Sequence, residues 1–86
     1  MKKPATNEND ITDPVTDCRQ LRKKKGWSQG DLAYYGRVSL GVIWRMENAE
    51  DDEALENTRV GSFLSVAEAL SVKPTKLYPR LGELLR

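Results

Sequence analysis

The apolar residues of the chain recur at helical spacing in a series of short segments. Val15, Cys18 and Leu21 are each three positions apart, as on one face of a helix, and Pro14 suits a first helical position. Gly26 follows the basic run "RKKK" and marks a helix end. The pattern predicts a first helix that begins at Pro14, ends before Gly26 and carries Cys18 as a small core residue.

Serine residues stand at the start of the next two predicted helices. Ser28 has Asp31 three positions later, which is the spacing of a capping box, and Gly36 marks the end of this second helix. Ser39 is a candidate N-cap for a third helix over residues 39–48. A two-turn helix, a tight turn and another short helix predict a helix-turn-helix unit, with Trp27 as an apolar anchor between the first two helices.

The third predicted helix, "SLGVIWRMEN", divides into two faces when its residues are placed at about 100° intervals. The face expected to turn inward carries Ser39, Ile43 and Met46, with Val42 and Glu47 at its edges. The opposite face carries Leu40, Gly41, Trp44, Arg45 and Asn48. The helix is therefore predicted to pack with one face and to leave the other free for a partner.

The second half of the chain predicts two further short helices and a last turn. The segment "ENAEDDEALEN" is a polar, acidic loop, after which Thr58 is a candidate cap for a fourth helix. The apolar stripe of that helix is Val60, Phe63, Leu64, Ala67 and Leu70. Pro74 begins a fifth helix that ends near Tyr78, and Pro79 precedes the last turn.

These elements predict an all-α fold of five short helices around one core, without strands. Residues 1–12 are polar and lack periodicity, so we expect a flexible N-terminal tail there and one domain over residues 13–86. The C-terminal leucines exceed what the core needs, and some are expected to form a dimer interface while others close the core. The leucines concerned are Leu77, Leu81, Leu84 and Leu85.

Composition limits the functions that are open to the chain. With 86 residues, 38% hydrophobic and 31% charged, it fits one small globular domain. It has no histidine, one cysteine, no Gly-rich phosphate loop and no nucleophile elbow. No apolar run is long enough to span a membrane, and the start lacks the apolar stretch of a secretory signal. We therefore expect a cytoplasmic binding protein with no metal, no cofactor, no membrane partner and no enzymatic activity.

The charges are unevenly distributed although the net charge is only +1. From Arg19 to Arg45 there are seven basic residues and one acidic residue, a net charge of +6. From Glu47 to Glu56 there are six acidic residues and no basic one. Such separation favours a basic face that could meet nucleic acid, although the "RKKK" run also suits the exposed end of a helix.

At these positions the sequence resembles the lambda-repressor-like, Cro-type (XRE) family of helix-turn-helix DNA-binding proteins. The resemblance runs from about Val15 to Tyr78, through "LRKKKGWSQGDLAYYGRVSLGVIWRMEN" and, after the acidic loop, "FLSVAEALSVKPTKLY". It rests on the combination of "SQ" before "LA", "VS" before the third helix, "RMEN" at its end and "AEAL" later. It implies a compact five-helix domain whose second and third helices form the helix-turn-helix.

The resemblance also implies roles for individual residues. Ser28 and Gln29 match positions that contact the DNA backbone, and Gln29 can also lie near a base. Leu40, Gly41 and Arg45 match positions that face base edges, and Asn48 matches a phosphate-binding position. Further candidates for the DNA-binding surface are Arg37, Ser39 and Trp44. Arg22 and Glu47 match a pair that joins the first helix to the third, and we predict a partly buried ion pair between them.

Several alternatives remain open at the level of the sequence. The family usually has Gly or Asn immediately before "VS", but here Arg37 holds that place and Gly36 precedes it, so either residue could adopt the left-handed conformation. The acidic loop is also longer than is common in the family. Trp44 could lie against DNA or pack on Tyr34 or Tyr35, and Arg45 could grip a guanine or pair with an acidic side chain.

The function implied is sequence-specific transcriptional regulation. The chain would be a small dimeric repressor that inserts its third helix into the major groove of a palindromic operator in double-stranded DNA. Few hydrogen-bonding groups face outward from that helix, which favours a contribution from DNA shape. The alternative is an antitoxin, which combines DNA binding with a segment that covers a toxin, and here the acidic loop or the tail could serve.

Overall fold

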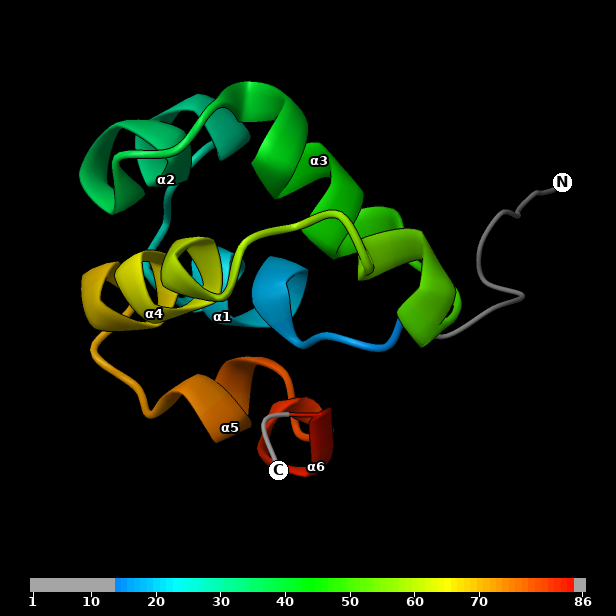
Figure 1. The fold of residues 1–86 in the computed structure, drawn as a ribbon. Coiled ribbons are helices and arrows are strands. Elements are labelled where there is room, and N and C mark those ends of the chain that lie inside the picture. Colours follow the sequence, from blue (N-terminus) through cyan, green and yellow to red (C-terminus); the bar gives the residue numbers. More distant parts are fainter. Residues whose placement is uncertain (1–13, 85–86) are drawn as a thin grey trace, which may run out of the picture.

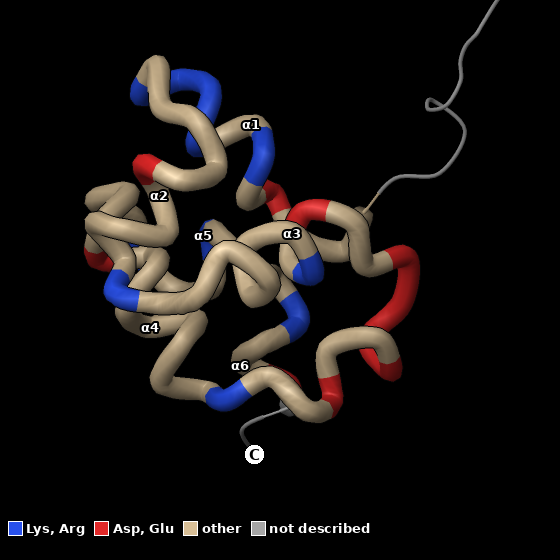
Figure 2. Tube along the Cα trace, turned by 90° about the horizontal axis from the view of Figure 1, so that it is seen from above, with Lys and Arg blue, Asp and Glu red and all other residues tan. Residues whose placement is uncertain are grey.

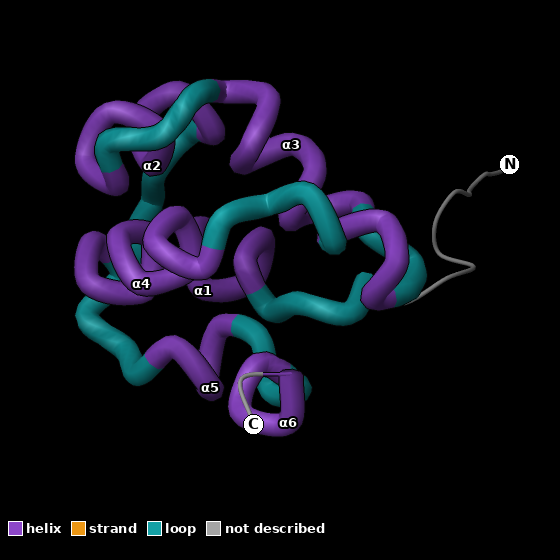
Figure 3. Tube along the Cα trace, in the orientation of Figure 1, coloured by secondary structure: helices purple, strands orange, loops and turns teal. Residues whose placement is uncertain are grey.

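The computed structural model describes residues 14–84, and all regular structure within them is helical. The α-helices are α1 (Cys18–Lys24), α2 (Gln29–Gly36), α3 (Leu40–Asn48), α4 (Val60–Ala69), α5 (Pro74–Leu77) and α6 (Leu81–Leu84). A short 3-10 helix, η1 (Asp52–Leu55), lies between α3 and α4. The predicted tail at residues 1–12, and Leu85, lie outside the described residues. The fold is all-helical and compact, with helices and short connections throughout the described range (Figure 3).

The helices lie in tiers around a single core. In Figure 1, α2 and α3 lie above α4 and α1, while α5 and α6 lie below them. Helix α4 packs against α2 on one side and α5 on the other, and α1 packs against α3. The most deeply buried apolar side chains come from every tier: Cys18, Leu32, Ile43, Met46, Phe63, Val66, Ala67, Leu77 and Tyr78. The α2–α3 pair is therefore supported from beneath by α4 and α1.

The first helix is shorter than the sequence predicts. It begins at Cys18 rather than Pro14, and Asp17 at its N-cap makes no side-chain hydrogen bond to the helix. Thr16, which is buried, donates its hydroxyl proton to the Met46 carbonyl at 2.6 Å and accepts a hydrogen bond from the Cys18 amide at 3.3 Å. The chain before α1 is thus fixed to α3 by tertiary contacts rather than by helical structure.

Cys18 occupies a core position, as predicted, and its thiol is fully buried. Burial raises the pKa of this thiol to about 12, with a smaller contribution from the charge of Glu47, while Arg22 and Arg19 act in the opposite direction. Since only the thiolate reacts, a reagent such as iodoacetamide should label the folded protein roughly a thousandfold more slowly than the unfolded chain. Equal rates in buffer and in concentrated urea would contradict this burial.

The connection between α2 and α3 places Arg37 in the left-handed conformation, with φ 58° and ψ 41°. The sequence left open whether Arg37 or Gly36 adopts this conformation, and in the structure it is Arg37. Its backbone N–H donates to the carbonyls of Ala33 and Tyr34, which closes the C-terminal end of α2. Gly36 remains helical, and its lack of a side chain serves another purpose.

We expect Arg37→Gly to raise the free energy of unfolding by about 0.5–1 kcal/mol, because glycine adopts the left-handed conformation without the steric cost that other residues bear. Arg37→Ala is the matched control, since it removes the same charge but retains a Cβ. Urea unfolding monitored by circular dichroism would measure both variants. If Arg37→Ala stabilises the protein as much as Arg37→Gly, the gain comes from charge and the backbone explanation is wrong.

At Gly36, α2 approaches α4 closely. A Cβ atom at this position would lie 3.3 Å from Val66 Cγ2 and 3.5 Å from Val66 Cα. This close contact places Val66 beneath α2 and so bears on which face of α4 turns inward.

Helix α4 is rotated relative to the predicted stripe. Phe63, Val66, Ala67 and Leu70 are buried, whereas Val60 and Leu64 are 41% and 46% exposed. The predicted cap is also wrong, because Arg59 holds the N-cap position and no side chain caps this helix. The contact between Gly36 and Val66 explains the rotation, since it places Val66 rather than Leu64 under α2.

The segment predicted as a polar loop is more ordered than expected. The Asp51 carboxylate caps η1 by accepting a hydrogen bond from the Ala54 amide at 2.9 Å, and Leu55 is buried. Asp52 accepts a hydrogen bond from the Tyr78 hydroxyl at 2.5 Å and forms an ion pair with Arg80 at 2.6 Å. Burial together with the adjacent Asp52 carboxylate raises the pKa of Tyr78 to about 12. These contacts tie the acidic segment to the C-terminal tier.

Candidate nucleic-acid interface

Helix α3 has one buried face and one face that is exposed among the described residues. Ile43 and Met46 are completely buried, whereas Leu40 and Trp44 are 55% and 59% exposed. Gly41, Arg45 and Asn48 are exposed beside them, so all five residues assigned to the outer face from the sequence lie there. The side chain of Ser39 points out of the core, unlike the prediction that grouped it with Ile43, because it is used as the helix cap.

Trp44 does not pack on the tyrosines of α2. The Tyr35 ring stacks on Trp27 with centroids 4.7 Å apart, and Tyr34 meets Tyr35 edge-on at 5.2 Å. Trp27 is half-buried against the core, and its carbonyl accepts a hydrogen bond from Arg22 at 2.8 Å. Trp27 thus joins α1 to α2, as predicted, and the Trp44 ring remains at the surface.

Both predicted serine caps are present. The Ser28 hydroxyl accepts a hydrogen bond from the Asp31 amide at 3.0 Å, and the Asp31 carboxylate accepts one from the Ser28 amide at 2.8 Å. The Ser39 hydroxyl accepts from the Val42 amide at 3.2 Å. Because a capping hydroxyl uses its oxygen as an acceptor, its proton remains available to an external acceptor such as a phosphate. Both serines are exposed.

Glu47 joins the first three helices through one buried carboxylate. Its side chain has no exposed surface, and it accepts from Arg22 Nε at 2.6 Å and from Arg22 Nη2 at 3.1 Å. The Arg22 side chain is 12% exposed, so the predicted pair is present and largely buried. Gln29 donates to the same carboxylate at 3.0 Å, and Arg19 lies at 3.4 Å.

The pKa of Glu47 reflects this environment. Burial raises the pKa, but hydrogen bonds from Arg22 and Gln29, the positive charge of Arg22 and a hydrogen bond from Arg19 outweigh burial, so the pKa is lowered. Glu47 is therefore ionised at neutral pH. The Gln29 amide is directed at this carboxylate, whereas the sequence placed Gln29 among the DNA contacts.

Arg45 and Asn48 make different use of their polar groups. The Asn48 amide donates to the Trp44 carbonyl at 2.8 Å, and its oxygen accepts from Arg19 at 3.2 Å. Arg45 makes a long hydrogen bond of 3.4 Å to the Thr58 hydroxyl, and it forms no ion pair with the acidic residues of the described range. Asn48 is thus engaged within the domain, while the Arg45 guanidinium keeps most of its donors free.

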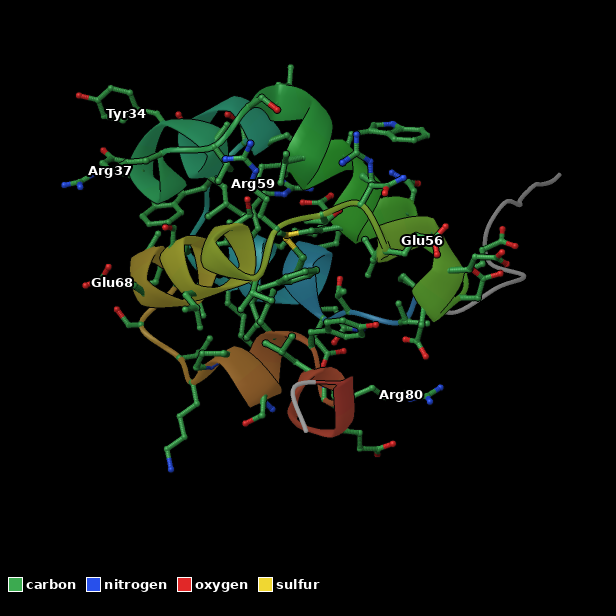
Figure 4. All side chains as sticks on the ribbon, viewed as in Figure 1. Tyr34, Arg37, Glu56, Arg59, Glu68 and Arg80 are labelled. Atoms are coloured by element: carbon green, nitrogen blue, oxygen red, sulfur yellow. The ribbon has the colours of Figure 1, made fainter. Side chains whose placement is uncertain are left out.

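The basic run at the end of α1 and the acidic run after α3 are separated in the fold. Figure 2 shows the basic end of α1 and the acidic segment after α3 at different edges of the molecule. Arg37 projects from the end of α2, and Arg59 lies between the α2–α3 connection and α4 (Figure 4). Sequence reasoning missed Arg59, although it is the first cation after the acidic run and could have been noticed for that reason.

The predicted dimerisation residues are only partly available. Leu77 and Leu81 are 0% and 3% exposed, because they close the core beneath α4, so in this structure they cannot also contact a second subunit. The Leu84 side chain and Leu85 lie outside the described residues. Some of these leucines were expected to close the core, and Leu77 and Leu81 do so.

Neither a metal site nor a membrane span is found in the described residues. Within residues 14–84, no group of three or more potential ligands among His, Cys, Asp and Glu is arranged to hold a metal ion. No helix in the same range is long and apolar enough to cross a bilayer. Comparisons with protein-family models, curated proteins and solved structures give no match. The surface around α3 is therefore the feature of the described residues that bears on function.

Proposed function

We propose that the protein binds double-stranded DNA sequence-specifically, as a small transcriptional repressor, through a helix-turn-helix formed by α2 and α3. The observation that carries the proposal is the outer face of α3, which holds exposed Leu40, Trp44 and Arg45 with no packing role in the domain. An α-helix with such a face fits the major groove of B-DNA. The resemblance to lambda-repressor-like domains supports the same arrangement.

In this proposal each group on the outer face has a distinct task. Arg45 donates to guanine O6 and N7, and Leu40 contacts a thymine methyl group. Gly41 carries no side chain, which allows the helix to approach the bases closely. A Cβ at this position would meet the Ser39 hydroxyl at 3.8 Å and no other described residue outside its own stretch of helix within 4 Å. Trp44 lies along the sugar–phosphate backbone. With so few hydrogen-bonding groups, the shape of the operator supplies part of the specificity.

Phosphate contacts come from the flanks of α3. The free hydroxyl protons of Ser28 and Ser39 and the guanidinium of Arg37 are suited to this role. Arg59 joins this set on the basis of its position (Figure 4). Gln29 and Asn48 act instead by positioning, because Gln29 holds the Glu47 carboxylate and Asn48 holds the Trp44 carbonyl.

We further propose that two copies bind a palindromic operator. One helix reads only a half-site, and a two-fold dimer places its recognition helices about 34–36 Å apart, one turn of DNA. The interface does not use Leu77 and Leu81, which are in the core. The stoichiometry of the protein–operator complex, measured by sedimentation, tests this part: one chain per palindrome is the result that rejects it.

The experiment that tests DNA recognition is selection from a random double-stranded DNA library, followed by affinity measurements on the enriched sequence and a scrambled one over a range of salt concentrations. We expect a palindromic consensus and a logarithmic affinity that falls linearly with the logarithm of salt concentration. No enrichment, together with no salt dependence, would contradict the proposal and would favour a module that works through protein contacts alone, such as the toxin-binding half of an antitoxin.

A further inference from the structure

We propose that a groove between η1, the start of α4 and the α5–α6 segment binds a small organic cation with an apolar body, such as an arylalkylamine. The groove has a volume of about 390 Å³. This volume lies in the range of small-molecule sites in proteins. The groove lies beside the acidic segment, and none of the residues that line it belongs to α2 or α3.

The floor of the groove is apolar and rigid. It is formed by Leu55, Phe63 and Leu81, which are 4%, 2% and 3% exposed. The Phe63 ring packs against Tyr78 with centroids 5.1 Å apart, and Val60, at 41% exposure, forms an open wall. An aromatic or aliphatic body in the groove would cover Val60 and lie on this floor, which removes apolar surface from water.

The rim of the groove is acidic, and its carboxylates differ in whether they already have a hydrogen-bond or ion-pair partner. Asp52 is already bound to Tyr78 and Arg80, whereas Glu53 and Glu56 are exposed and form no ion pair with another described residue. None of the residues that line the groove is Lys or Arg. Two carboxylates beside an apolar floor attract an ammonium group and repel a carboxylate, so the charge of the rim selects a cationic ligand.

Thr58 connects the groove to α3. It lines the groove, and its hydroxyl accepts the hydrogen bond from Arg45, the proposed base-reading residue. A ligand in the groove therefore contacts the residue that holds the Arg45 guanidinium. If the proposed DNA-binding function holds, any effect of the cation on the affinity for DNA is matched by an equal effect of DNA on the affinity for the cation. Binding of the cation itself does not depend on that function.

The test uses NMR titration of the full-length chain, without DNA, with three probes of similar shape: 2-phenylethylamine, 2-phenylethanol and 3-phenylpropionate. We expect the amine to shift the amide signals of Glu53, Glu56, Thr58 and Val60. Its dissociation constant should be roughly three- to tenfold lower than that of the alcohol, with the carboxylate weakest, because each exposed charge pair contributes modestly.

Two double variants make the test specific. Glu53→Gln/Glu56→Gln should lose the preference for the amine but keep weak binding of all three probes. Glu50→Gln/Glu68→Gln removes the same charge from exposed positions outside the groove and should keep the preference. The proposal is overturned if the three probes bind equally to the unaltered chain, or if both double variants behave alike.

A second copy of the chain is the competing occupant of the groove. If the signals of Val60 and Glu56 shift on dilution of the free protein, and the amine competes with that change, the groove is a subunit interface and the proposal is wrong. The outcome of the amine titration does not depend on the outcome of the DNA library selection. Failure to enrich an operator would reject the proposed function and leave amine binding in place, and absence of amine binding would leave DNA recognition untouched.

Discussion

Glu47→Ala is expected to lower the free energy of unfolding by about 3–5 kcal/mol, the largest effect of any single charge substitution in the domain. The loss is large because the substitution leaves the neighbours of Glu47 without their buried partner. The Arg22 guanidinium, only 12% exposed, would lose its buried counterion, and Gln29 would lose its acceptor. A buried charge without a partner cannot recover its hydration while the helices remain packed.

Urea unfolding monitored by circular dichroism measures this loss, and Arg19→Ala is the matched control. Arg19 contacts the same carboxylate at 3.4 Å but is 44% exposed, so its removal should cost no more than about 1 kcal/mol. Similar losses in the two variants would show that burial does not govern the strength of this network, contrary to our interpretation.

The pH dependence of stability provides an independent check on Glu47. Its pKa is lowered in the folded state, so the carboxylate stabilises the fold fully above its unfolded pKa of about 4.3. This contribution is lost as the pH falls through the lower folded value. Glu47→Ala should therefore weaken the loss of stability on acidification, and an unchanged acid transition would count against the assignment.

Arg45→Ala is expected to weaken binding to the selected operator by about 1–3 kcal/mol and to relax the base preference at one position of each half-site. Arg45 is free for this role because its one contact, to Thr58, is long and its guanidinium has no acidic partner among the described residues. Fluorescence anisotropy with the operator and with each single-base variant would measure both effects.

Lys76→Ala is the matched control for Arg45→Ala. Lys76 is exposed on α5, in the tier farthest from α2 and α3 (Figure 1), so its removal takes one positive charge from the far side of the molecule. It should leave operator affinity nearly unchanged. An equal loss from Arg45→Ala on operator and on random DNA would mean that Arg45 contributes charge alone and reads no base.

The features that could be predicted from the sequence depend on residues close together along the chain, or on a pairing implied by the resemblance. The capping box at Ser28 needs only the spacing to Asp31, and the Ser39 cap needs only the start of the next apolar stripe. The two faces of α3 follow from helical periodicity. The contact of Arg22 with Glu47 spans 25 positions and came from the family resemblance rather than from spacing.

The features that could not be predicted depend on how helices meet. In α4, apolar residues cover so wide an arc that two neighbouring stripes fit the same periodicity, and the close approach at Gly36 selects the one that contains Val66. Which of the C-terminal leucines close the core is equally a matter of how the helices meet, and Leu77 and Leu81 are the buried ones. The order of the acidic segment was missed because Asp52 gains its partners Tyr78 and Arg80 from the C-terminal tier, far along the chain.

The contact between Asp17 and Leu77 joins the first described helix to the C-terminal tier. The Asp17 amide donates to the Leu77 carbonyl at 2.8 Å, so the start of α1 and the end of α5 lie side by side. The two bonded residues stand at either end of the segment that contains α1 to α5. Exchange of the Asp17 amide hydrogen with solvent therefore reports the opening of the docked ends of this segment rather than the fraying of a single helix.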